Sequence, residues 1–316
     1  MTERFYLCSR QDGLELGIIL SVPDEGDVRG IVQFAHGMCG KKEKFLPSME
    51  YLSSQGFACI INDHRGHGES IRSENDRGYM YKAGYRALVD DMKTVSDFAM
   101  ERYPGKPLFL VGHSMGSLAA RIYARQYGKG LAGIFLCGSP ARNPLSGIAR
   151  IFSAMLCALG CGHFRPYAIQ KATSWKYNRR FRNEGFQAWT CSDPKVREAA
   201  AADPACNFTF TANGAFNLMS MMKCAYSRER VTNPGLPVFL MNGEDDPCSK
   251  GAEGLAYAAG EASKVGYINV RTFLYHGMRH EILSEPASGA VLGDMLSQMD
   301  KIISAGHGVS AISFLS

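Results

Sequence analysis

PLFLVGHSMGSLAARIYARQY, residues 107–127, is the stretch from which the rest of the chain can be interpreted. Its apolar run at 108–111 is typical of a buried strand, and the alanine-rich segment after Gly116 is typical of a helix. Between them, GHSMG at 112–116 matches the pattern Gly-x-Ser-x-Gly. A strained strand-to-helix turn needs small residues on both sides of its serine. We therefore predict strand, sharp turn and helix, with the Ser114 hydroxyl at the carboxyl end of the strand.

Similar apolar runs recur along the chain and alternate with helical segments. The runs lie at residues 30–35, 57–62, 133–137, 236–242 and 270–275. The helical segments lie near 45–55, 87–100, 252–260 and 289–303. This alternation predicts an α/β fold with a mostly parallel sheet and helices on both faces. Near the start, Asp12-Gly13 between two apolar runs predicts a hairpin at an antiparallel edge.

The alternation stops in the middle of the chain. Between residues 141 and 232 there are helical stretches but no clean strand-helix rhythm. Residues 1–140 and 233–316 share one alternation, so we predict two parts of a single α/β core interrupted by a helical insertion at 141–232.

Within the insertion, one helical face is wholly large and apolar. Its residues are Ile148, Ile151, Phe152, Met155, Leu156 and Leu159. This face either packs as core of the insertion or contacts substrate acyl chains or a lipid surface. Under the second interpretation Phe152, Met155 and Leu156 are candidate substrate-binding residues, and the insertion would make peripheral contact with a membrane.

Composition narrows the classes of function. The net charge of +5 is spread along the chain, and the basic cluster at 176–182 (KYNRRFR) is better explained as a solvated helix face than as a nucleic-acid site. Several of the ten cysteines lie in apolar runs, and the first ten residues lack a signal-peptide pattern, so we expect a cytoplasmic protein. Cys157, Cys161 and His163 have no second ligand pair at zinc spacing, so no metal site is predicted.

A serine nucleophile needs a base, and the base needs an acid that orients it. The last strand is followed by two histidines, His276 and His280, and the preceding strand is followed by two acids, Asp245 and Asp246. Parallel strands end at one edge of the sheet, so one residue of each kind can reach Ser114. Position alone leaves both choices open.

Hydrolysis also needs donors for the oxyanion of the tetrahedral intermediate. The backbone N–H of Met115 follows the serine at a helix N-terminus, and the backbone N–H of Met38 lies in the loop after the first apolar strand. We predict these two amides as the oxyanion hole. We expect His36, His64, His67 and His113 to have structural roles.

Five motifs occur in order: HGM at 36–38, DHRGHGES at 63–70, GHSMG at 112–116, GEDDP at 243–247 and HGMRHEILSE at 276–285. With them the chain resembles the monoacylglycerol lipase and lysophospholipase group of the α/β-hydrolase superfamily, a group often labelled serine aminopeptidase-like. The resemblance implies that Ser114 is the nucleophile, Asp246 the orienting acid and His280 the base. It also implies that the insertion is a cap domain, although the sequence of the insertion is not diagnostic of the group.

These observations predict a serine hydrolase that cleaves a small-molecule carboxylic ester or lipid, with monoacylglycerol or lysophospholipid as the expected substrate. We expect an acyl-enzyme intermediate, no cofactor, no metal and no nucleic-acid partner. Two alternatives share the fold. An amidase or aminopeptidase would use the same residues but would need acidic groups for a free amine, and the insertion is basic. A binding protein without catalysis is disfavoured by the intact serine, acid and histidine.

Overall fold

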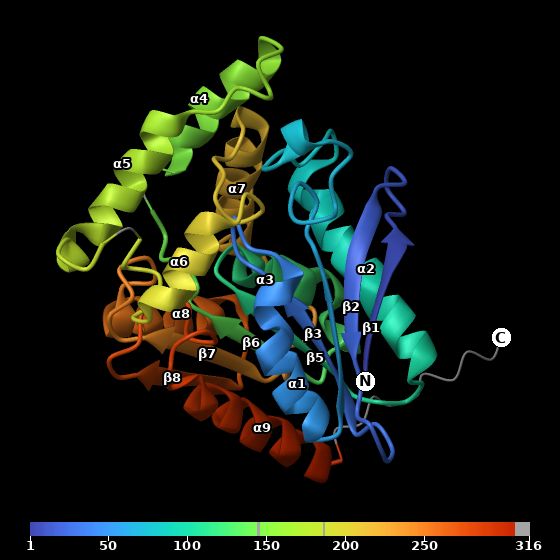
Figure 1. Ribbon diagram of the computed structural model, residues 1–316. Coiled ribbons are helices and arrows are strands. Elements are labelled where there is room, and N and C mark those ends of the chain that lie inside the picture. Colours follow the sequence, from blue (N-terminus) through green and yellow to red (C-terminus); the bar gives the residue numbers. More distant parts are fainter. Residues whose placement is uncertain (144–145, 186, 307–316) are drawn as a thin grey trace.

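The computed structural model describes residues 1–143, 146–185 and 187–306 (Figure 1). In this part of the chain eight strands form one sheet in the order β1-β2-β4-β3-β5-β6-β7-β8. Pairing is antiparallel between β1 and β2 and between β2 and β4, and parallel from β4 onward. The predicted α/β architecture and the antiparallel edge hairpin are therefore confirmed.

The strands are short, and most are buried on both faces, as parallel strands between helical layers usually are. Their bounds are β1 Thr2–Cys8, β2 Glu15–Ser21, β3 Gly30–Ala35, β4 Phe57–Asn62, β5 Leu108–His113, β6 Gly133–Cys137, β7 Val238–Gly243 and β8 Val270–Tyr275. Only the two edge strands, β1 and β8, carry several exposed side chains in the described part.

Helices cover both faces of the sheet. Their bounds are α1 Leu46–Ser54, α2 Gly84–Arg102, α3 Met115–Tyr127, α4 Ser146–Ala158, α5 Tyr167–Asn178, α6 Pro194–Ala202, α7 Ala212–Ala225, α8 Gly251–Val265 and α9 Ser288–Ser304, with short 3-10 segments η1 Lys42–Phe45, η2 Glu74–Asp76, η3 Gly128–Gly130 and η4 Arg179–Phe181. Side chains of α2, α3 and α8 share one buried cluster with the sheet, and those of α1 and α9 share another on the opposite face.

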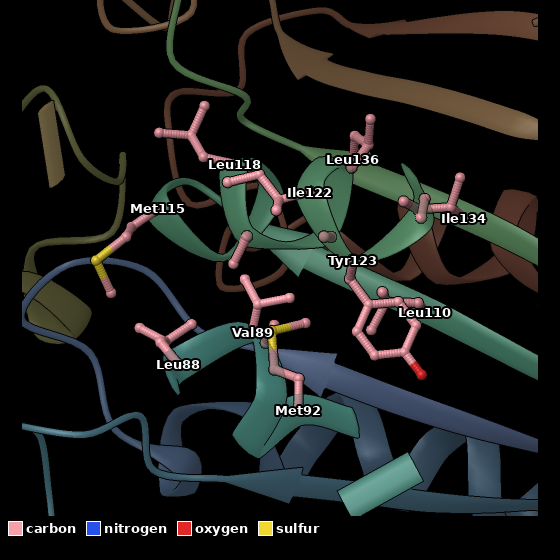
Figure 2. Close-up of a cluster of buried hydrophobic side chains, with 14 of the residues drawn as sticks. Leu88, Val89, Met92, Leu110, Met115, Leu118, Ile122, Tyr123, Ile134 and Leu136 are labelled. Carbon is pink, nitrogen blue, oxygen red and sulfur yellow. The ribbon is translucent and has the colours of Figure 1, made fainter. Parts of the chain in front are cut away.

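The first cluster surrounds α3, the helix predicted from the opening stretch. Leu118 and Ile122 of α3, Leu88 and Met92 of α2 and Leu110 of β5 belong to this one cluster, and Figure 2 shows them arranged around α3. These side chains are fully or almost fully buried. Burial of each such side chain contributes about 1.5–3 kcal/mol, so α3 is held firmly where it begins, next to Ser114.

The segment between β6 and β7 contains α4 to α7, and in Figure 1 α4 and α5 project beyond the end of the sheet. The interpretation of the α4 apolar face as core is wrong. Ser153 is the one buried residue among the described residues of α4, whereas Ile151 is 65% exposed and Leu159, just after the helix, 70% exposed. The side of α4 that carries Ala149 and Ser153 is the less exposed one and packs near α7, because small side chains let two helices approach closely.

Across the described ranges, no helix is long and apolar enough to cross a membrane. The longest apolar stretch of the insertion, α4, has 13 residues, which is well short of the roughly 20 that a bilayer span requires.

Candidate active site

Ser114 lies at the turn between β5 and α3, with a backbone conformation that few residues adopt. Its φ is 52° and its ψ is −119°. The turn closes tightly: a Cβ atom on Gly112 would lie 2.5 Å from the carbonyl oxygen of Gly116, and one on Gly116 would lie 2.1 Å from that of Ala35. Both glycines are therefore required by sterics, as the sequence pattern predicted. Because this strained backbone conformation is not helical, Ser114 lies before the first turn of α3, and its side chain is partly exposed.

Three side chains from three loops form a continuous hydrogen-bonded chain. His280 Nε2 lies 2.8 Å from Ser114 Oγ, and His280 Nδ1 lies 2.8 Å from Asp246 Oδ2. With Asp246 ionised, Nδ1–H donates to the carboxylate, and Nε2 is left to accept the Ser114 hydroxyl proton. Asp246 is held in turn by the backbone N–H of Cys248, which donates to Oδ1 at 2.8 Å. The arrangement has the geometry required to activate a serine hydroxyl.

Electrostatics favour the same roles. Burial lowers the pKa of His280, but the Asp246 carboxylate outweighs burial, so the pKa of His280 lies above its ordinary value. Burial raises the pKa of Asp246, but the His280 ring and the hydrogen bonds to the carboxylate outweigh it and hold that pKa below its ordinary value. Asp246 therefore stays ionised and His280 is a stronger base than a free imidazole.

The two neighbouring candidates left open by position do not join this chain. Asp245 forms an ion pair with Arg180 at the surface. His276 is 94% exposed and pairs with Glu244. Among the four residues, the structure brings only Asp246 and His280 to Ser114.

The two amides predicted as oxyanion donors lie on either side of Ser114. Met115 is the first residue of α3, so its N–H has no acceptor within the helix. Met38 follows Gly37, and a Cβ atom on Gly37 would lie 3.0 Å from the Ser114 Cβ, which places this loop against the serine. In the described part of the chain, neither amide is among the backbone donors of turns, loops and caps. Their role as oxyanion donors stays a prediction.

Buried histidines shape the Met38 loop. His36 lies between two backbone groups: Nδ1 is 2.8 Å from the carbonyl of Gly37, and Nε2 accepts from the N–H of His64 at 2.9 Å. Burial lowers the pKa of His36 to about 4 and that of His67 to about 3. His113 contacts the backbone of His280, with Nε2 3.1 Å from the His280 carbonyl. These rings are neutral at pH 7 and have structural contacts, as expected.

The contacts between the insertion and the loop after β8 that carries His280, called the base loop below, were not predicted from the sequence. Arg279 donates to the Ala188 carbonyl at 2.5 Å and pairs with Glu184 at 2.6 Å. The Trp189 ring, in the same segment, lies 5.0 Å from the His280 ring. The motif HGMRHEILSE carried a signal for the base loop, but no motif marks 184–191 as its partner.

The predicted substrate-binding residues lie on α4, away from these contacts. Phe152 is 40% exposed and Met155 52% exposed, while Leu156 is half-buried. Among the described residues, no hydrogen bond or ring contact joins any of the three to Ser114, Asp246 or His280. Phe152 instead lines an apolar hollow with Phe164, Pro166, Tyr167 and Ile169. Their role as substrate contacts stays a prediction.

The residues weighed as metal ligands or nucleic-acid contacts have other partners. The described residues contain no group of three or more His, Cys, Asp or Glu side chains able to hold a metal ion. His163 stacks on Tyr79 at 3.9 Å and pairs with Asp76. In the basic cluster, Arg180 pairs with Asp245 and Phe181 packs under the Arg279 guanidinium at 4.0 Å.

The fold, together with the hydrogen bonds that join Ser114, His280 and Asp246, defines a serine hydrolase of the α/β-hydrolase class. The family described as serine aminopeptidase, S33 (Hydrolase_4), matches residues 26–287, so the chain belongs to this family. The similar proteins relate it to esterases and lipases.

Similar proteins span nearly the whole chain. A monoacylglycerol lipase of Mycolicibacterium smegmatis is 26% identical over 276 residues, which cover 86% of this chain and 88% of that protein. A thermostable carboxyl esterase from Bacillus coagulans, solved in complex with glycerol, is 26% identical with a TM-score of 0.85, covering 96% of this chain and 99% of that one. A monoglyceride lipase variant from Saccharomyces cerevisiae shares the fold at 21% identity, with a TM-score of 0.73 and 95% coverage of both chains.

Proposed function

We propose that this protein hydrolyses carboxylic esters through an acyl-enzyme, with Ser114 as nucleophile, His280 as general base and acid, and Asp246 as the group that orients His280. One observation carries the proposal: the 2.8 Å contacts from Ser114 Oγ to His280 and from His280 to Asp246. A chain of this geometry converts a weakly nucleophilic hydroxyl into an effective one.

The proposed reaction has two halves. Ser114 Oγ attacks the ester carbonyl carbon while His280 Nε2 accepts the hydroxyl proton, and the amides of Met38 and Met115 bind the oxyanion. Collapse breaks the bond to the alcohol, which leaves with the proton from His280 and gives the acyl-Ser114 ester. Water then attacks that ester, again deprotonated by His280, and releases the carboxylic acid and free Ser114. Every proton is returned, so the reaction needs no cofactor.

We propose monoacylglycerol or lysophospholipid as the substrate and residues 141–232 as a cap over the site, with Phe152, Met155 and Leu156 as acyl contacts. The names of the similar proteins support a lipid ester, because they include a monoacylglycerol lipase and a carboxyl esterase crystallised with glycerol. The apolar hollow beside Phe152 offers surface for an acyl chain. Each CH₂ buried there would contribute about 0.8 kcal/mol.

We further propose that α4 and α5 contact a lipid surface. Large apolar side chains are exposed along both helices and the turn between them: Ile148, Ile151, Met155, Leu159, Phe164, Tyr167, Ile169 and Trp175. Exposed cations on α5, Lys171 and Lys176, match the negative charge of an anionic leaflet. Ten unpaired cysteine thiols support a cytoplasmic location for this contact.

Labelling with a fluorophosphonate, together with an ester panel, tests the function. Wild-type protein is expected to incorporate one label at Ser114, and Ser114→Ala none. A panel of p-nitrophenyl esters from about C2 to C16, with monoacylglycerol and aminoacyl amides alongside, then distinguishes the classes. Turnover of the amides above the esters would assign the amidase alternative, and labelling without any turnover would favour the binding-protein alternative.

A further inference from the structure

Directly after His280, Glu281 forms an ion pair that reaches a distant part of the chain. Lys44 Nζ lies 2.7 Å and 2.8 Å from the two carboxylate oxygens of Glu281. Both side chains are largely buried, 22% and 17% exposed. An ion pair withdrawn from water is screened little by salt, and removal of one partner leaves the other charge buried and unpaired.

The pair connects two parts of the proposed catalytic machinery. Lys44 belongs to η1, which begins four residues after Met38, so it lies on the same segment as one oxyanion donor. Glu281 is covalently next to the base, and its own N–H donates to the carbonyl of Thr190 at 2.7 Å. The base loop is therefore fixed on one side to the oxyanion segment and on the other to the insertion.

The charges of the pair also face the His280 ring. Around that ring, the β7–α8 loop contributes Asp246, the end of β5 contributes the neutral His113, and η1 contributes Lys44. From the base loop itself, Glu281 raises the pKa of His280 and Lys44 lowers it, both less than Asp246 does. The flanking Arg279 is neutralised by Glu184. With both charges present, their effects on the pKa of His280 oppose each other.

We infer that Lys44 and Glu281 are positioning residues: the pair fixes the His280 loop against the segment that carries Met38, and it presents the base with two opposite charges that offset each other. This inference rests on the proposed function, since it concerns the basicity and placement of His280. It predicts that removal of the Glu281 charge and removal of the Lys44 charge shift the pKa of His280 in opposite directions. A purely structural ion pair would not do this.

The test is the pH dependence of kcat/KM for a short-chain ester, measured on Glu281→Gln, Lys44→Met and the double variant. Glu281→Gln leaves Lys44 unopposed, so the rising limb is expected to move to lower pH by about half a unit. Lys44→Met leaves Glu281 unopposed, so the limb is expected to move to higher pH by a similar amount. In the double variant the limb is expected near the wild-type position, with kcat/KM about tenfold lower because the loop is no longer held in place.

Two controls separate this role from general damage. Glu261→Gln removes the carboxylate of the Lys264–Glu261 pair on α8, whose Glu261 side chain is 15% exposed, and is expected to leave the limb unmoved. Lys44→Arg keeps the charge and is expected to keep the wild-type limb. The pH dependence of fluorophosphonate labelling also reports the pKa of His280 and needs no ester. The inference about Lys44 and Glu281 can therefore be tested even if the proposed substrate class is wrong.

Shifts in the same direction for both single variants, or no shift in either, would overturn the inference. If a single variant does not fold because an unpaired charge is buried, the double variant decides. A wild-type limb with reduced kcat/KM supports a positioning pair, whereas fully wild-type activity without the pair refutes it.

Discussion

The surroundings of Ser114 and the outer face of α4 and α5 differ in which kind of side chain is buried. At the serine, Asp246 and His280 are almost fully buried, and each has specific hydrogen-bond partners. On α4, large apolar side chains such as Ile151 face outward, while the small side chain of Ser153 is the buried one. Around Ser114, the polar side chains of Asp246 and His280 are buried and hydrogen-bonded. On α4, large apolar side chains are exposed to solvent.

The difference shows what stabilises each region. Burial of a polar group is costly unless it is hydrogen-bonded, and Asp246 and His280 find their partners within the chain. Exposed apolar side chains gain nothing until something removes them from water. Under our proposal a lipid does so, and the two regions should then respond differently to substitution.

The largest effect is expected at the centre of the site. Ser114→Ala and His280→Ala should each lower kcat for esters by on the order of 10⁶, because a triad fails as a unit. The melting temperature of Ser114→Ala should change by no more than about 2 °C, since that side chain is partly exposed and fills no part of the hydrophobic core. His280→Ala should remain folded with a lower melting temperature, because the buried Asp246 carboxylate loses its partner. Steady-state kinetics and thermal melts check both statements. A severe loss in His276→Ala with a mild one in His280→Ala would reverse the assignment of the base.

A smaller but still severe effect is expected at the orienting acid. Asp246→Asn should lower kcat by about 10⁴, because the amide would hold the imidazole in the wrong tautomer. Asp245→Asn, the matched control, loses only a surface pair with Arg180 and should cost less than about threefold. Parallel kinetics on the two variants check this. Equal losses would remove the distinction between the two carboxylates.

On the outer face the expected effects concern long-chain substrates. Phe152→Ser should raise KM for C12 to C16 esters about tenfold and leave C2 to C4 esters unchanged, with the melting temperature little altered because the side chain is exposed. Phe135→Ser in the buried core of β6 serves as the contrast, since it should destabilise the protein and affect all chain lengths alike. An unaltered chain-length profile would exclude Phe152 as an acyl contact.

Binding to vesicles tests the same face without turnover. Ile151→Ser with Leu159→Ser should weaken sedimentation with anionic phosphatidylglycerol vesicles by about tenfold or more, because each side chain loses on the order of 1–2 kcal/mol of burial. The Ser114→Ala protein, which cannot consume lipid, is the background for the experiment. Equal sedimentation of both proteins would remove α4 from the lipid contact.

The smallest effect is a displacement along the pH axis. Because the base must be neutral, activity should rise with pH through an apparent pKa above the ordinary 6.5 of histidine and be lost below it. In Asp246→Asn the carboxylate that raises the pKa of His280 is gone while burial remains, so the residual activity should rise at lower pH than wild type. Profiles of kcat/KM between about pH 5 and 9 measure the shift.

What could be predicted from sequence depended on how local the cause was. The β5 strand, the Ser114 turn and α3 could be predicted because the Gly-x-Ser-x-Gly pattern identifies the turn within five residues, although the steric need for Gly116 comes from the Ala35 carbonyl at the end of β3. Choosing Asp246 and His280 over their neighbours needed the family resemblance, since spacing alone treats adjacent loop residues alike. The outward orientation of the α4 face could not be predicted, because periodicity identifies an apolar stripe but not what covers it.

Arg279 gives the insertion a fixed point. Its guanidinium holds the Ala188 carbonyl and Glu184, while its own N–H donates to Glu285, which also binds the N–H of Ser192. Through these contacts the positions of Glu184, Ala188 and Ser192 are coupled to the peptide unit next to His280. Under our proposal that residues 141–232 form a cap, this segment is therefore an anchor that ties the cap to the core directly beside the base.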